Sequence, residues 1–98
     1  MTYSIEALLQ AGDLQKKMEN IWFRQALGTR LRSLRIERQI EQAKLADDAG
    51  MTASNLCKIE MGQRYMTLYN IAALCLAMDI SPDELMPRKE EPEHAAAV

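Results

Sequence analysis

Apolar residues recur at helical spacing along most of the chain. Over residues 13–26 they form one helical face, at Leu14, Met18, Ile21 and Trp22. Their spacing of i, i+4, i+7 and i+8 predicts an amphipathic helix. A shorter helix is expected before it, interrupted at Gly12-Asp13, and another over about 24–38 that can continue directly from it.

Four more helical segments are expected, over residues 42–49, 52–61, 67–78 and 81–86. Glycines at Gly50 and Gly62 suit the left-handed ends of helices, while Thr52 and Thr67 are good N-cap residues. Pro82 suits the first turn of the last segment. The segment after Thr67 carries an apolar stripe expected to face inward: Leu68, Ile71, Leu74, Cys75 and Met78.

The composition agrees with a single all-α domain. Of the 98 residues, 48% are hydrophobic and 27% charged, and helix-forming residue types dominate. No apolar run approaches the roughly 20 residues of a membrane span, and the first residues lack the features of a signal peptide. We therefore expect a soluble cytoplasmic protein. Residues 87–98, with two prolines and a charge run, are expected to be a disordered tail.

Few residues offer catalytic or metal-binding chemistry. The cysteines, Cys57 and Cys75, and the single histidine, His94, do not form the set of about four ligands that a structural metal needs. No common catalytic or phosphate-binding motif occurs. We therefore expect neither an enzyme nor a metal or cofactor site, and we interpret the cysteines as packing residues rather than a redox switch.

The charge is unevenly distributed along the chain. The net charge is −2, divided as −1 over residues 1–23, +3 over 24–65 and −4 over 66–98. A basic centre between acidic ends permits a DNA-facing surface. On charge alone, a solvated helix face explains it equally well.

The two segments on either side of Gly50 indicate a helix-turn-helix. Two short helices joined by a three-residue turn that contains glycine are typical of this motif, and Ala49-Gly50-Met51 is such a turn. Small Ala46 allows close helix approach, and Met51 can fill the angle between the helices. Other helical hairpins can imitate this pattern.

Over residues 27–86 the sequence resembles the Xre/Cro-type helix-turn-helix family of transcriptional regulators, relatives of the lambda repressor DNA-binding domain. The matching stretches are Leu31-Arg32-Ser33-Leu34-Arg35, Gln42-x-x-Leu45-Ala46, Gly50-Met51-Thr52, Leu56-x-x-Ile59-Glu60-x-Gly62-x-Arg64 and Ile80-Ser81-Pro82-Asp83-Glu84-Leu85. The resemblance implies a five-helix lambda-repressor-like domain over residues 24–86, preceded by an extra helical extension, residues 1–23. It also implies a third helix that enters the major groove of double-stranded DNA.

The resemblance assigns roles to individual residues. Base reading falls to Ala53, Ser54, Asn55 and Lys58, and phosphate binding to Gln42, Thr52 and Arg64. Arg35 and Glu60 match a pair that ties the first helix to the third. We interpret this pair as structural, because burying either charge alone is costly.

The sequence departs from the family pattern around the expected phosphate contacts. Glu41 stands where Ser or Thr usually caps the second helix, Met61 replaces a polar residue and Met66 replaces a proline. Asp47 and Asp48 add negative charge to the second helix. These residues weaken the expected phosphate contacts without affecting the fold.

These features predict a sequence-specific transcriptional regulator, a repressor that binds a near-palindromic operator as a homodimer. One alternative is an antitoxin-type regulator that also binds a partner toxin. A second is a protein-interaction module that has lost DNA binding. Residues 1–23 are too apolar for a spare tail, so they either pack on their own domain or contact a second subunit or partner protein.

Overall fold

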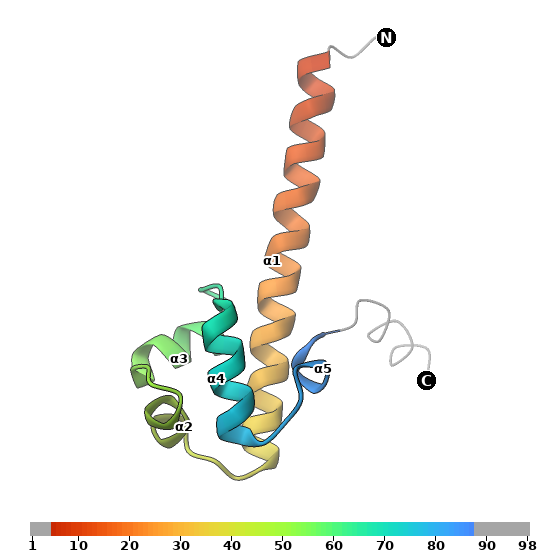
Figure 1. Cartoon of the computed structure of the whole chain (residues 1–98). Coiled ribbons are helices and arrows are strands. Elements are labelled where there is room, and N and C mark those ends of the chain that lie inside the picture. Colours follow the sequence, from red (N-terminus) through yellow and green to blue (C-terminus); the bar gives the residue numbers. More distant parts are fainter. Residues whose placement is uncertain (1–4, 88–98) are drawn as a thin grey trace.

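A computed structural model describes residues 5–87, with the backbone alone described for residues 5–17 and for Glu19. The described residues form five helices and no strand, which confirms the all-α prediction (Figure 1). The helices are α1 (Ile5–Glu37), α2 (Gln42–Asp48), α3 (Ala53–Glu60), α4 (Leu68–Met78) and α5 (Pro82–Leu85). The expected disordered tail lies, after Pro87, outside the described residues.

Helix α1 is a single helix of 33 residues whose N-terminal part extends well past the other four helices (Figure 1). The predicted interruption at Gly12-Asp13 is therefore wrong. Glycine within a helix costs only about 1 kcal/mol relative to alanine, and neither residue blocks the helical backbone as proline would. The extension and the first helix of the domain are thus one element.

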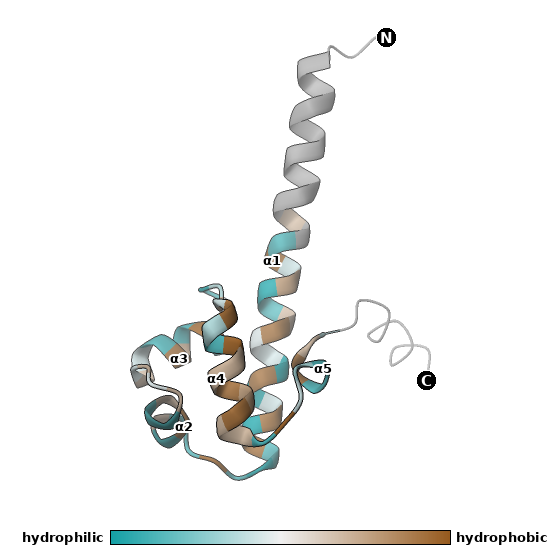
Figure 2. Ribbon diagram, in the orientation of Figure 1, coloured by the Kyte–Doolittle hydropathy of each residue, from teal (hydrophilic) through white to brown (hydrophobic). Residues whose placement is uncertain are grey.

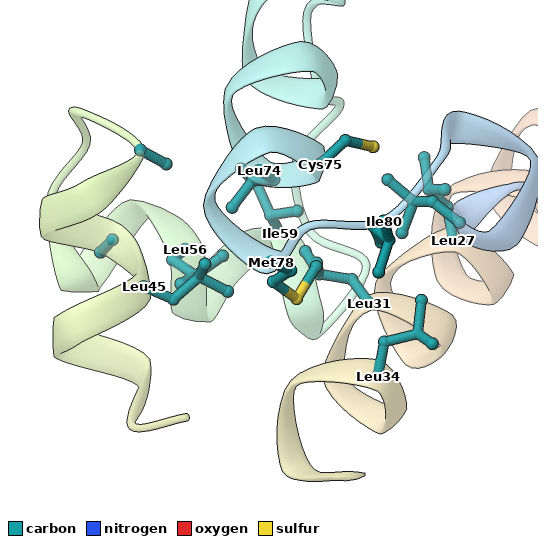
Figure 3. Packing of buried hydrophobic residues seen from close by; sticks show 13 residues of the cluster. Leu27, Leu31, Leu34, Leu45, Leu56, Ile59, Leu74, Cys75, Met78 and Ile80 are labelled. Carbon is teal, nitrogen blue, oxygen red and sulfur yellow. The ribbon is translucent and has the colours of Figure 1, made fainter. Parts of the chain in front are cut away.

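One hydrophobic core joins all five helices. Each helix contributes one leucine that is fully buried: Leu31, Leu45, Leu56, Leu74 and Leu85. In Figure 3 the core side chains of α1, α3 and α4 converge on the space between these helices. The earliest buried residue along the described part of α1 is Leu27, so the core holds the C-terminal part of this helix only.

The predicted ends of the shorter helices are confirmed. Gly50 and Gly62 have φ angles of +73° and +76°, the left-handed conformation that glycine adopts without steric cost. The side chains of Thr52 and Thr67 cap α3 and α4 by accepting hydrogen bonds from backbone N–H groups. These caps and turns fix where α3 begins and how the chain leaves it.

The inward stripe predicted for α4 is correct only in part. Leu74, Cys75 and Met78 are buried, but Leu68 is 85% exposed. Leu68 is the first residue of the helix and lies one turn before the residues that reach the core. The apolar periodicity therefore includes a position that no described part of the chain covers. Tyr69 and Leu76 are also exposed, and α4 is brown over much of its length in Figure 2.

Both cysteines are free thiols. Burial raises the pKa of the Cys75 thiol, and the negative charge of Glu84 raises it further. A neutral thiol is a poor nucleophile, so Cys75 acts as a core residue. Cys57 is half-buried, with its Sγ 3.7 Å from Met61 Sδ.

Within residues 5–87, no helix combines the length and the apolar character of a membrane span. Among the side chains that the structure describes, no three His, Cys, Asp or Glu residues gather in a way that could hold a metal ion.

Candidate nucleic-acid interface

Helix α3 is oriented by two buried residues, Leu56 and Ile59, which turn one side of the helix toward the core. Its start is fixed by Thr52, whose Oγ1 accepts a hydrogen bond from the Asn55 backbone N–H at 3.0 Å. The predicted phosphate contact Thr52 is therefore the N-cap of α3. The opposite side of the first two turns faces solvent.

The four residues predicted to read bases lie on this solvent-facing side or at its edge. Ala53 and Ser54 are exposed, while Asn55 and Lys58 are half-buried. Ser54 and Lys58 are four positions apart and so lie on one face of the helix. Together the four residues present a methyl group, a hydroxyl, an amide and an ammonium group, which suit thymine methyls and the polar edges of bases.

The loop after α3 returns to the beginning of the same helix. Gly62 turns the chain, and Arg64 Nη1 donates a hydrogen bond to Asn55 Oδ1 at 2.9 Å. A residue predicted to contact phosphate and one predicted to read bases are therefore joined at one point of the surface. Asn55 retains the two N–H donors of its amide for another partner.

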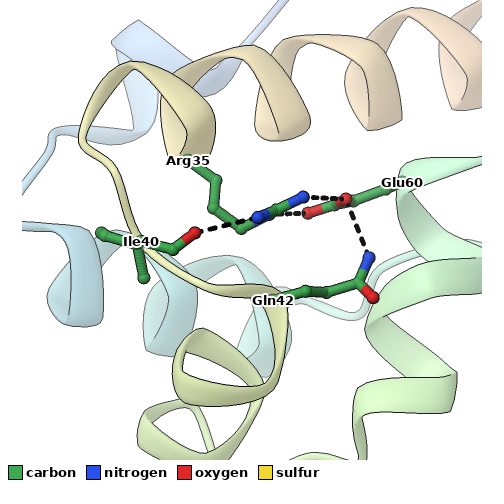
Figure 4. Close-up of polar contacts among 4 residues, drawn as sticks. All are labelled: Arg35, Ile40, Gln42 and Glu60. Carbon is green, nitrogen blue, oxygen red and sulfur yellow. Dashed lines mark hydrogen bonds and ion pairs between the residues drawn. The ribbon is translucent and has the colours of Figure 1, made fainter.

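Behind α3, three helices meet in a polar network (Figure 4). Arg35 of α1 holds both carboxylate oxygens of Glu60, with Nε–Oε2 at 2.7 Å and Nη2–Oε1 at 3.1 Å. The same guanidinium donates to the Ile40 carbonyl at 2.9 Å. The side chains of Arg35 and Glu60 are 12% and 3% exposed. Bidentate pairs of this kind are strong and directional, so the network fixes α3 relative to α1.

Gln42, a predicted phosphate contact, takes part in this network. Its Nε2 donates a hydrogen bond to Glu60 Oε1 at 3.0 Å. An amide nitrogen carries two N–H groups, so one donor is used inside the protein and the other is left for a ligand. The preceding Glu41 is the N-cap of α2 but makes no side-chain capping hydrogen bond.

The acidic residues of α2 are partly neutralised. Lys44 Nζ lies 2.8 Å from Asp48 Oδ1, and this hydrogen bond raises the pKa of Lys44. Around α3 the balance is different, because no Asp or Glu occurs between Glu60 and Asp79 or between Glu19 and Glu37. These stretches of α1 and of the chain after α3 therefore carry arginines and no carboxylate.

Two contacts beside the interface were not predicted from the sequence. The guanidinium of Arg24 lies over the Tyr65 ring, 4.8 Å from its centroid. Gly28 lies so close to α3 that a Cβ there would contact the Ile59 carbonyl oxygen and come within 2.7 Å of the Glu60 carbonyl oxygen. A glycine inside a strong helical pattern is a signal for such close approach. The Arg24–Tyr65 contact has no comparable local signal.

The sequence model of the Cro/C1-type HTH DNA-binding domain matches residues 30–91, more than half of the chain. No curated protein sequence gave a significant match.

Solved structures of regulators share the fold. The restriction-modification controller protein C.AhdI from Aeromonas hydrophila is 40% identical, with a TM-score of 0.62 over 63% of this chain and 94% of that protein. The clp gene regulator ClgR from Corynebacterium glutamicum is 27% identical, with a TM-score of 0.63 over 64% of this chain and 67% of that one. The hypothetical transcription factor NHTF from Neisseria, 20% identical with a TM-score of 0.64 over 74% of this chain and 84% of that one, shows likeness in fold.

Proposed function

Since the chain belongs to the family of Cro/C1-type helix-turn-helix DNA-binding domains, we propose that it is a cytoplasmic, sequence-specific regulator of transcription that places α3 in the major groove. The carrying observation is the solvent-facing side of α3. Ala53, Ser54 and Lys58 present three different chemical groups there, and no intramolecular hydrogen bond engages their side chains within the part of the chain described. Free donors and acceptors on a rigid helix are what base recognition requires.

Asn55 completes the proposed base-reading set, and three further residues contact the DNA backbone. Gln42 offers its second N–H at the start of α2, and Arg64 offers the guanidinium donors that Asn55 does not use. The Thr52 hydroxyl accepts from the backbone N–H of Asn55 and keeps its own proton to donate to a phosphate. Contacts of this kind position a protein on DNA without reading its sequence.

We further propose that the regulator is a repressor and acts as a homodimer on a near-palindromic operator. Two-fold dimers of helix-turn-helix proteins bind half-sites about 10 base pairs apart. The likeness to C.AhdI, described as a restriction-modification controller protein, supports a role in control. A repressor occupies its operator without further machinery, and a domain of this size suits that role.

Selection from a randomised duplex pool at about 0.1 M salt tests the proposal. We expect enrichment of a two-fold symmetric motif, since two copies of α3 read the two half-sites. Lys58→Ala should select a motif with one base position relaxed in each half-site, equal to a loss of about 1–3 kcal/mol of discrimination. Lys44→Ala is the matched control, because Lys44 pairs with Asp48 on α2 and should not alter the motif.

Two results would contradict the proposal. A folded protein that enriches no motif does not read sequence. If Lys58→Ala weakens binding equally to all duplexes, Lys58 contacts phosphate and does not read bases.

A second candidate function is binding of a partner protein through residues 1–23, in addition to DNA. The observation that favours it is the exposure of Met18, Ile21 and Phe23 on α1. The alternative that this segment packs on its own domain does not fit Met18 and Ile21, which are 61% and 42% exposed. A second subunit or another protein would cover them.

A further inference from the structure

Arg24 and Arg64 line one small cavity from two directions, Arg24 from α1 and Arg64 from the loop between α3 and α4. Phe23, Leu27, Ile59, Tyr65, Met66 and Ile71 form the rest of its wall. Two of the lining residues are therefore arginines, and none is acidic. The cavity has room for a small group rather than for a ligand molecule.

Stacking on Tyr65 fixes the position of Arg24. Its guanidinium carbon lies 4.8 Å from the ring centroid, within the range of a cation–π contact. Its Nε is buried and has no hydrogen-bond partner. Stacking thus holds the guanidinium plane without using its terminal N–H groups, a geometry that suits arginine far better than lysine.

The surrounding charge is one-sided. Residues 20–36 and 61–78 contain five arginines and no acidic residue. Arg35 is neutralised by Glu60, and Arg30 donates to the Glu84 carbonyl at 2.7 Å. Within the described residues, neither Arg24 nor Arg64 has an ion pair. Two arginines that line one cavity and have no ion pair among the described residues favour binding of an anion.

The position of Arg64 indicates which anion. Arg64 is hydrogen-bonded to Asn55 in the first turn of α3, so the two-arginine cluster adjoins the helix proposed to enter the major groove. A duplex gripped by α3 brings its sugar-phosphate backbone past this point, and guanidinium groups recognise phosphate oxygens well. An acidic protein segment would satisfy the charge but has no reason to lie against α3.

We propose that Arg24, held on the Tyr65 ring beside Arg64, binds a backbone phosphate of the DNA and extends the contact surface onto α1. This inference rests on the proposed function. Arg24 precedes residues 30–91, which match the family domain, so the family match does not assign this contact.

The salt dependence of binding to the selected duplex tests the inference. Each phosphate neutralised adds about 0.9 to the slope of log affinity against log salt. Arg24→Gln should reduce the slope by about two, one for each half-site of the proposed homodimer, and leave the base preference unchanged. Arg24→Lys should keep the slope because it keeps the charge. Arg38→Gln is the charge-matched control: Arg38 lies 3.9 Å from Glu84 of α5, and its loss should not change the slope.

Phosphate ethylation interference locates the contact. Wild type should show one interfering phosphate per half-site that Arg24→Gln no longer shows. If Arg24→Gln fails to fold by circular dichroism, Arg24→Met replaces it, because a methionine keeps the hydrocarbon stem against Tyr65.

The outcomes separate this inference from the function on which it rests. A wild-type protein that binds no duplex overturns both. A wild type that binds its duplex, with slope and interference pattern unchanged in Arg24→Gln, overturns the phosphate contact alone. Polyglutamate serves as a probe for acidic protein segments. If Arg24→Gln leaves the salt slope unchanged but abolishes binding of polyglutamate, the two arginines bind an acidic protein, and the phosphate contact is overturned.

Discussion

Glu60 is a buried carboxylate whose position depends on two neighbours. Arg35 holds both of its oxygens, and Gln42 donates to one of them. With 3% of its side chain exposed, water cannot replace either partner. One residue thus links α1, α2 and α3 directly behind the proposed DNA-reading surface.

Replacing Glu60 by alanine should lower the free energy of unfolding by about 3–5 kcal/mol, because the Arg35 charge would stay buried without its counter-ion. Urea denaturation measures the change. Asp48→Ala is the control, since it breaks the exposed pair with Lys44 and should change stability little. Equal effects of the two substitutions would show that burial of the Arg35–Glu60 pair has no energetic consequence.

For single residues, the sequence predicts the chemical role of a side chain better than the partner that the side chain contacts. The pairing of Arg35 with Glu60 was expected from the family resemblance, and the structure places the two side chains 2.7 Å apart. The hydrogen bond between Arg64 and Asn55 was not expected. Nothing in the spacing of two polar residues tells whether their side chains meet each other or remain free, because that depends on rotamers set by packing.

At the scale of elements, α1 and α3 meet backbone to backbone. Gly28 allows this approach, since any side chain there would contact the carbonyl oxygens at the end of α3. The approach brings Arg35, two turns further along α1, within reach of Glu60. The close packing and the buried ion pair are therefore parts of one helix–helix contact.

Gly28→Ala should destabilise the protein by about 1–3 kcal/mol, the usual cost of overpacking, although alanine gains about 1 kcal/mol in helix propensity. Thermal unfolding followed by circular dichroism checks this. Gly12→Ala makes the same change in the same helix, well before the first buried residue described, Leu27, and should not lower stability. A stabilised Gly28→Ala would mean that α1 and α3 separate at no cost.

Helix periodicity and caps predicted α2 to α5 because each of these helices has a local start or stop, such as Thr52 or Gly62. The same rules failed at Gly12-Asp13, where neither residue actually stops a helix. They also failed at Leu68, because periodicity marks the face that a residue occupies but not whether another element covers it. Tertiary packing decides the second point.

The whole molecule consists of a small core and a long protruding helix (Figure 1). Among the residues whose side chains the structure describes, the buried apolar ones run from Leu27 to Leu85, so this core begins after residues 18–23. The exposed Met18, Ile21 and Phe23 lie on that segment. An apolar surface that the domain does not need for its own core is available for another chain.

Deleting residues 1–20 should convert a dimer into a monomer while leaving the domain folded, because the buried residues that the structure describes begin at Leu27. Light scattering measures the mass, and circular dichroism checks the fold. Ile21→Glu in the full chain is a milder variant that places a charge in the same surface. A mass unchanged by the deletion would exclude this interface and leave the exposed α4 residues Leu68, Tyr69 and Leu76 as the next surface to test.

The continuity of α1 has a mechanical consequence. Its 33 residues span roughly 50 Å at the rise of an α-helix, and no break separates its protruding end from Gly28. At Gly28 the helix touches the α3 backbone with no side chain between them to absorb a displacement. We therefore expect a partner that binds the protruding end of α1 to change the position of α3 through this contact.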